Sequence, residues 1–319
     1  VSSTDADAND ISLTTTSGDI NVVTITTGSL GDVSLTSAAA INDDGTAATL
    51  ITAEDLALRA ATGIGSNDAL DTVISNLAFT NNTSGDVNIS NTGGLTIASV
   101  DGITSSNNTG GGVTLSATSP VTFAVDLTAS GNILVQAIES AATDFDNITV
   151  NAAVTVESTG GNITFEAGDR INVNATASVK ADTNGSQNIT LDSGLGDIDS
   201  DGLMTLDGSI LAGSTSGLIT LDLNAQQGAI QAGTGTLSGF GLQLFSTGSA
   251  GSFDLDNTTT NDIDTLAAET AGSIAYADTS ALNVATAGAT TGITTSSDDV
   301  TLCATSITLA ASVAAGTGT

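Results

Sequence analysis

The sequence contains no His and no Trp, and it has only one Cys, one Pro, one Met and one Tyr in 319 residues. The absence of His removes the commonest general base and the commonest metal ligand. A single Cys excludes an intrachain disulfide framework and a thiolate zinc site. Only three bases stand against 35 acids, for a net charge of −32. Nucleic acid and anionic membrane surfaces are therefore excluded as partners, because both require clustered Lys and Arg.

Long hydrophobic runs are also missing. No apolar run reaches the length of about 18 residues that a membrane-spanning helix needs, so we expect no transmembrane helix and no membrane insertion. No basic segment is followed by an apolar one, so no signal peptide is expected. Both ends of the sequence read like its interior, and we therefore expect it to be a window on a longer array.

The residues that are present favour an all-β protein with a thin core. The chain is 39% hydrophobic with a mean hydropathy of +0.25, which is too apolar for a disordered acidic tail. Aromatic residues make up only 3%, so the core must consist mainly of aliphatic side chains. Most of the 35 acids are Asp, which together with 36 Gly favours many tight turns.

One short phrase recurs along the chain: a small, acidic or amide turn residue followed by apolar, polar and apolar residues. Alternation with period 2 over such short runs predicts short strands with one buried face. Like positions recur at a constant spacing. The pairs are Val87 and Val113, Leu95 and Val121, Ile163 and Ile189, and Ile274 and Val300. This spacing predicts a β-solenoid with about 26 residues and three short strands per coil.

A longer repeat of about 187 residues lies over this pattern, in which residues 18–125 resemble residues 203–313. Val33-Ser34-Leu35 matches Ile219-Thr220-Leu221, for example, and Val113-Thr114-Leu115 matches Val300-Thr301-Leu302. We therefore predict a single continuous β-solenoid over residues 1–319. About 12 coils stacked ~4.8 Å apart would form a rod on the order of 60 Å long.

The region from Leu56 to Phe123 resembles the β-helical repeats of filamentous-haemagglutinin-like exoproteins. The resemblance rests on residues 63–65 (Gly-Ile-Gly), 91–97 (Asn-Thr-Gly-Gly-Leu-Thr-Ile) and 111–115 (Gly-Gly-Val-Thr-Leu). Residues 263–309 carry the same pattern more loosely. The resemblance implies a right-handed parallel β-helix from a large bacterial surface or secreted adhesin, and therefore an extracellular or cell-surface location.

The predicted function is structural and not enzymatic: a stalk or fibre section of such an adhesin. Its partners would be continuing repeats or neighbouring copies placed end to end, together with host or cell-surface glycans. An alternative is a subunit of a self-assembling filament or sheath. A carbohydrate-active β-helix enzyme is a second alternative, since glycoside hydrolysis needs only two carboxylates. It is disfavoured because Arg59, Arg170 and Lys180 are the only bases, Tyr276 is the only Tyr, and the acids are spread through turns.

One motif suggests a cofactor. Asp197, Asp199 and Asp201, followed by Gly202, have the spacing of a calcium-binding loop, in which alternate oxygens wrap a hard cation. Position 12 of that loop is Gly208 rather than Glu, and the flanks read as strands. The alternative is therefore an acidic corner of the solenoid. A second, weaker candidate is the group Asp254, Asp256, Asp262 and Asp264. Cys303 is expected on the outer face, as an incidental thiol.

Overall fold

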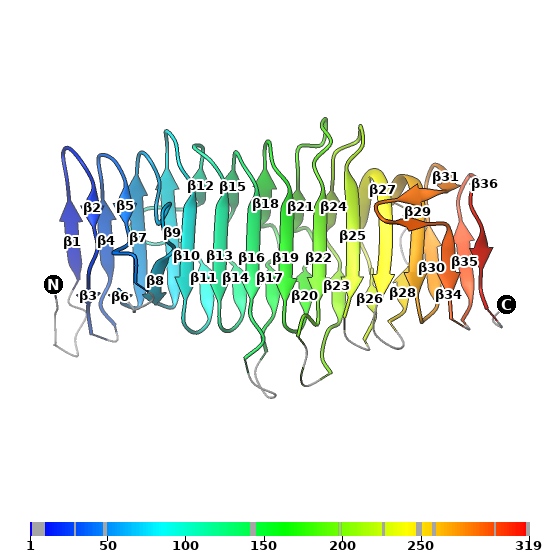
Figure 1. Cartoon of the computed structure of the whole chain (residues 1–319), viewed down its shortest axis with the longest axis horizontal. Helices are drawn as coiled ribbons and strands as arrows, with labels where there is room; N and C mark the ends of the chain where they lie inside the picture. Colours follow the sequence, from blue (N-terminus) through cyan, green and yellow to red (C-terminus); the bar gives the residue numbers. More distant parts are fainter. Residues whose placement is uncertain are drawn as a thin grey trace.

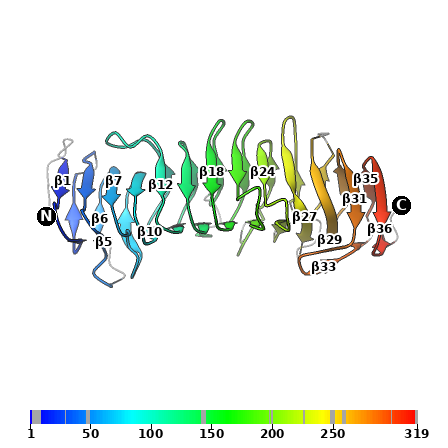
Figure 2. The same ribbon diagram turned by 90° about the horizontal axis from the view of Figure 1, so that it is seen from above.

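The computed structural model describes residues 1, 10–28, 30–46, 50–140, 145–196, 198, 200–224, 227–246, 251–256, 260–296 and 298–316. Every regular element within these residues is a β-strand, and 33 of the strands join one continuous hydrogen-bonded sheet. The chain winds in about 12 turns along one axis, with the two termini at opposite ends (Figure 1, Figure 2). This confirms the predicted all-β parallel solenoid.

Three strands per coil form three faces, and each strand pairs in parallel with the equivalent strand of the next coil. Face 1 contains β10 (Val87–Asn91), β13 (Val113–Ala117), β16 (Ile133–Ala137), β19 (Ile163–Ala167), β22 (Ile189–Ser193), β25 (Leu218–Leu223), β34 (Ile293–Thr295) and β37 (Val313–Ala314). Face 2 contains β11 (Leu95–Ile97), β14 (Val121–Phe123), β17 (Ile148–Val150), β20 (Ile171–Val173), β23 (Met204–Leu206), β26 (Ala229–Ile230), β28 (Phe253–Leu255), β30 (Ile274–Ala277) and β35 (Val300–Cys303). Face 3 contains β12 (Ser106–Asn108), β15 (Leu127–Ala129), β18 (Thr155–Ser158), β21 (Ser178–Lys180), β24 (Ser209–Leu211), β31 (Ala281–Val284) and β36 (Ser306–Leu309).

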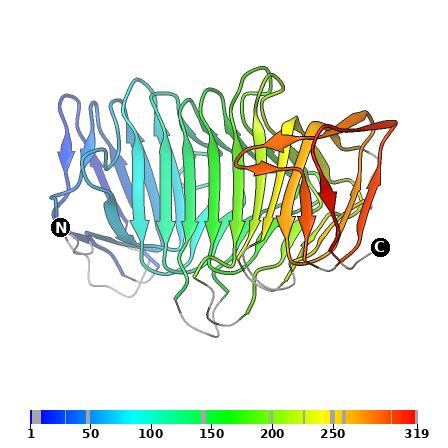
Figure 3. The ribbon, with the colours of Figure 1, turned by 45° about the vertical axis from the view of Figure 1, so that its right-hand side comes forward.

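The strand grouping changes towards both ends. Near the C-terminus, β27 (Thr236–Ser246) and β29 (Asp262–Thr270) run from face 3 into face 1 without a break, as the long strands in Figure 3 show. In the first coils, one stack of paired strands continues into both face 2 and face 3: β1 (Ile11–Thr14), β4 (Val33–Thr36), β7 (Asp55–Ala60) and β9 (Asn76–Asn81). The remaining strands of these coils continue into face 1: β2 (Ile20–Asn21), β3 (Ile25–Thr26), β5 (Ile41–Asn42), β6 (Ile51–Thr52) and β8 (Leu70–Val73).

All four residue pairs predicted from the constant spacing are direct register partners. The coil length nevertheless varies between coils. The stretch from Val113 to its partner Ile133 is a third shorter than the stretch from Ile133 to its own next partner, Ile163. The strands keep their length, so the difference lies in the connections between faces.

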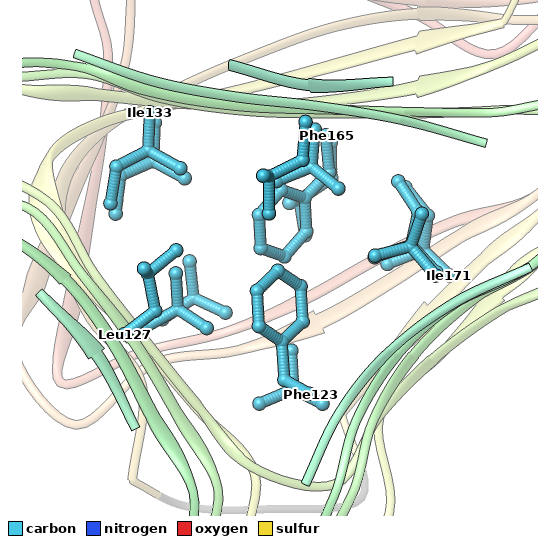
Figure 4. Packing of buried hydrophobic residues seen from close by; sticks show 14 of the residues in the cluster. Phe123, Leu127, Ile133, Phe165 and Ile171 are labelled. Atoms are coloured by element: carbon cyan, nitrogen blue, oxygen red, sulfur yellow. The ribbon is translucent and has the colours of Figure 1, made fainter. Parts of the chain in front are cut away.

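Aliphatic side chains stack in rows inside the solenoid. Along face 1, one interior row runs through Val113, Ile133, Ile163 and Ile189, each at most 1% exposed. Figure 4 shows side chains from the three faces pointing into the same interior, with Phe123 of face 2 beside Phe165 of face 1. Their ring centroids are 5.9 Å apart and the rings are nearly parallel. These two rings therefore fill the middle of the rod, where aliphatic rows alone would leave space.

Buried asparagines hold the corner between face 3 and face 1 in the early coils. Asn81 donates to the Asn108 side-chain oxygen at 2.9 Å, and both residues are fully buried. Asn108 also donates to the carbonyls of Gly85 and Gly112. Each amide thus satisfies turn carbonyls that the solenoid ladder leaves free at a corner.

The turn residue ahead of each strand links neighbouring coils as well. The side-chain oxygen of Asn132 accepts the backbone N–H of Asn162, and the Asn162 side chain accepts that of Asn188. Asp86 does the same for Gly112. This role explains why the recurring phrase often starts with Asp or Asn.

Two segments fold over the outside of the solenoid. Val100 and Ile103 pair with each other and cover the outward-facing Ala57 and Ala78, all four being buried. A hairpin of β32 (Thr286–Ala287) and β33 (Thr290–Thr291) lies across β27 and β29, as Figure 1 shows. None of the described residues forms a helix long and apolar enough to span a bilayer.

Candidate functional site

A depression in the surface arises from unequal connections between face 1 and face 2. Residues 138–147 join β16 to β17, and residues 194–203 join β22 to β23, whereas only residues 168–170 join β19 to β20. The described parts of both long connections leave the body on the same side (Figure 1). The short middle connection therefore lies at the bottom of a depression between them.

We call this depression the side groove. It encloses about 570 Å³, and its main lining residues are Ile138, Glu139, Glu166, Gly168, Leu195 and Ile198. Ile138, Leu195 and Ile198 are 47%, 42% and 59% exposed, which is unusual for large aliphatic side chains gathered in one place. The groove is thus apolar along its walls, with two carboxylates among its lining residues.

Hydrogen bonds fix the first wall to the groove floor. The side chain of Asp146 is fully buried and accepts from the backbone N–H and the hydroxyl of Ser140, at 2.8 and 3.0 Å. The Asp146 backbone N–H in turn donates to the buried carboxylate of Asp169 at 2.7 Å. The base of the 138–147 connection is therefore held to the coil beneath it.

The second wall is held to the same coil by an ion pair. Arg170 Nε donates to both carboxylate oxygens of Asp201, at 2.6 and 2.8 Å. Ser193 donates its hydroxyl to the carbonyl of Gly202 at 2.8 Å. Asp169 and Arg170, adjacent in the short middle connection, thus anchor one wall each.

The close approach of the coils explains the glycine in the groove floor. A Cβ atom at Gly168 would lie 2.8 Å from Glu139 Cα and 2.8 Å from its carboxylate oxygen Oε2. Any larger residue would displace Glu139 from the position it has in the groove.

A row of carboxylates runs from the groove along the outside of face 1. Glu166, Asp192 and Asp222 are successive register partners at outward positions of β19, β22 and β25. Gln136, one coil earlier, donates to Glu166 at 2.7 Å. Neighbouring strands lie ~4.8 Å apart, so these negative charges are closely stacked.

The stacking changes the acidity of the row. Burial, then the charges of Asp222 and Glu166, raise the pKa of Asp192 to about 7, against an opposing hydrogen bond from Asn224. Burial also raises the pKa of Asp222. The row therefore includes a carboxyl group that changes charge near neutral pH and favours a cation beside it.

Sequence reasoning missed this row because it placed the acids in turns. The signal was present in three strand phrases that end in an acid: Ile163-Thr164-Phe165-Glu166, Ile189-Thr190-Leu191-Asp192 and Ile219-Thr220-Leu221-Asp222. The step from the first phrase to the second is shorter than the step from the second to the third, so only the register brings the acids into one row.

The predicted calcium residues are only partly described. Asp197 and Asp199 lie outside the described residues, whereas Asp201 is ion-paired with Arg170. The described residues contain no group of three acidic side chains that could hold a metal, and this includes the weaker candidate around Asp254 and Asp262. Calcium binding thus stays a prediction. Cys303 is exposed, as expected.

The last described coil forms a second exposed apolar surface. Ile307 and Leu309 continue the interior rows of Leu282 and Val284, which are at most 1% exposed. Ile307 and Leu309 are nevertheless 41% and 62% exposed, because no described residue covers them. This end presents both apolar side chains and an unpaired strand edge.

The fold and these surfaces define a parallel β-solenoid with an acidic outer row and a side groove. No family model, curated protein or solved structure matches the chain.

Proposed function

We propose that the chain is a stiff, non-catalytic section of the stalk or fibre of a large bacterial surface adhesin, located outside the cell. The observation that carries the proposal is the unbroken parallel ladder, which passes from Ile11 of the first strand to Ala314 of the last. About 12 coils at ~4.8 Å give a rod of ~58 Å. Such a rod acts as a spacer, because each coil between the two ends is fixed to both neighbours by hydrogen bonds and interior packing.

The charge distribution supports an exposed, soluble rod. A net charge of −32 keeps rods apart from one another and from anionic surfaces. Each of the three bases is paired with an acid on the rod's own surface: Arg59 with Asp101, Arg170 with Asp201, and Lys180 with Glu157. Acids therefore outnumber bases all along the surface, and those in exposed turns form a solvated coat.

The location is tested by labelling cells of the source organism with antibodies raised against the whole chain. Intact cells should be labelled as strongly as permeabilised cells. Labelling that requires permeabilisation would overturn the extracellular assignment. The mechanical role is tested separately by stretching the chain between two beads, which should show stepwise unfolding of groups of coils at high force.

A filament or sheath subunit is the second candidate, and the exposed coil end favours it. Ile307, Leu309 and the free edge of β36 would be covered if the first coil of another copy stacked on them. Sedimentation velocity over a range of concentrations separates the two candidates: a stalk section stays monomeric, whereas a filament subunit forms end-to-end polymers. Leu309→Asp should abolish such polymers. The matched change Ile230→Asp, on the side of face 2, should leave them intact.

A further inference from the structure

We infer that the side groove binds a short extended peptide segment of a partner protein, in which one basic side chain lies between aliphatic ones. The inference rests on the groove alone, and it holds whether the chain is a stalk section or a filament subunit.

The walls define the apolar part of the ligand. Ile138 on one wall and Leu195 and Ile198 on the other expose aliphatic surface to solvent across the groove floor. Covering this surface with aliphatic side chains removes apolar area from water and so favours binding. Binding grooves of a few hundred Å³ lined mainly by apolar residues, with a few polar groups for orientation, are typical of peptide and small-ligand sites.

The carboxylates define the charge of the ligand. Glu139 and Glu166 both line the groove, and Gln136 holds the Glu166 carboxylate in place. The chain has only three bases, and each forms an ion pair with Asp101, Asp201 or Glu157. A basic group of the ligand can therefore pair with Glu166 without displacing any of these ion pairs, and the adjacent Asp192 and Asp222 strengthen its attraction.

The shape favours a single extended chain. The two walls belong to coils on either side of β19, and they converge at the floor, where a Cβ atom at Gly196 would lie 3.8 Å from Glu139 Cβ. A groove that narrows in this way can take a strand-like segment along its floor but not a helix with its side chains, which is ~10–12 Å across. A polyamine would leave the aliphatic walls without apolar partners, and a neutral glycan would leave Glu166 without a counter-charge.

The groove is already formed in the unbound chain. Asp146 is tied to Ser140 and Asp169, and Asp201 is tied to Arg170, so both walls are fixed at their bases. A ligand therefore does not have to order these anchors, which lowers the entropic cost of binding.

The test measures fluorescence anisotropy of a labelled, acetylated and amidated peptide, Ser-Leu-Lys-Leu-Ser, with the full chain at near-physiological salt. Glu166→Gln should weaken binding about tenfold, since it removes a charge-assisted hydrogen bond. Asp222→Asn, which removes an equal charge from the same row outside the groove, should weaken it less than twofold. Ile198→Ser should weaken binding about fivefold, and Ile230→Ser on face 2 should leave it unchanged. Circular dichroism establishes that each variant is folded.

Three results would overturn the inference. Equal weakening by Glu166→Gln and Asp222→Asn would indicate diffuse attraction to an acidic rod. Equal affinity for Ser-Ser-Lys-Ser-Ser would show that the aliphatic walls take no part. Spermine that binds more tightly than the peptide, with the same dependence on Glu166 and Ile198, would assign the groove to a small polyamine. A peptide with Glu in place of Lys should not bind.

Discussion

Asp192 of β22 and Asp222 of β25 are direct partners on adjacent coils, and both point outward from face 1. Glu166 lies in the same row one coil before Asp192, and Asn224 donates a hydrogen bond to Asp192. Three carboxylates at consecutive positions of a parallel ladder repel one another, and this repulsion adds to burial in raising the pKa of Asp192. The row is therefore a region where charge opposes folding.

The stability of the chain should fall as the pH rises towards 7. The folded state raises the pKa of Asp192 from 3.8 to about 7, so between these values the folded chain holds this proton more tightly than the unfolded chain. The contribution of Asp192 to the free energy of unfolding is therefore greatest at low pH and is lost as the pH rises through 7. Asp192→Asn removes the charge, and should stabilise the chain at pH 8 by on the order of 1–2 kcal/mol.

Urea unfolding at several pH values from 4 to 8 checks this expectation. Asp68→Asn is the matched control, because Asp68 is an exposed turn residue outside the row. The control should change the unfolding free energy by less than about 0.5 kcal/mol at every pH. A gain from Asp192→Asn that is equally large at pH 4 would show that charge is not the cause.

The buried asparagine pair should matter more than any surface contact. Asn108→Ala removes a side chain that accepts from Asn81 and from the Gly110 backbone and donates to two carbonyls. We expect a loss of about 2–4 kcal/mol in unfolding free energy, because buried polar partners are left without hydrogen bonds. Asn107→Ala, at the neighbouring outward position of β12, should cost less than about 1 kcal/mol. Similar losses for the two variants, measured by urea unfolding, would contradict this role.

The register of the interior could be predicted from the sequence because alternation and stacking are local and repetitive. Val87 and Val113 occupy like positions in like phrases, and their pairing follows from a constant spacing. The short and long coils that meet at Ile133 could not be predicted, because connection length does not affect the pattern inside a strand.

The side groove escaped prediction for the same reason. It depends on two long connections that flank a short one, and on Glu139 and Ile198 lining one groove from the two coils on either side of β19. The cover of Ala57 and Ala78 by Val100 and Ile103 was equally hidden, since an outward alanine in a strand phrase carries no sign of what lies over it. Tertiary neighbours, not local pattern, decide both features.

The central aromatic stack should be the most sensitive part of the core. Phe165 is fully buried and lies beside Phe123 in the interior of the middle coils. Phe165→Ala should cost about 3–5 kcal/mol, because the coils above and below cannot close the cavity. Phe165→Leu restores the aliphatic row and should cost less than about 2 kcal/mol. Thermal unfolding, monitored by circular dichroism, distinguishes the two variants. Equal melting temperatures for Phe165→Ala and Phe165→Leu would show that the stack contributes little.

The Arg170–Asp201 ion pair should stabilise the second groove wall without calcium. Arg170→Met and Asp201→Asn should each destabilise the chain, and a double-mutant cycle should give a coupling of about 1 kcal/mol, because Asp201 is only 14% exposed. The coupling should be the same with calcium and with a chelator, since Arg170 already occupies both oxygens of Asp201.

A calcium loop would behave differently: added calcium would raise the unfolding free energy of the unaltered chain and reduce the coupling, because the ion and Arg170 would compete for one carboxylate. Urea unfolding under the two conditions decides between an acidic corner held by arginine and a metal site.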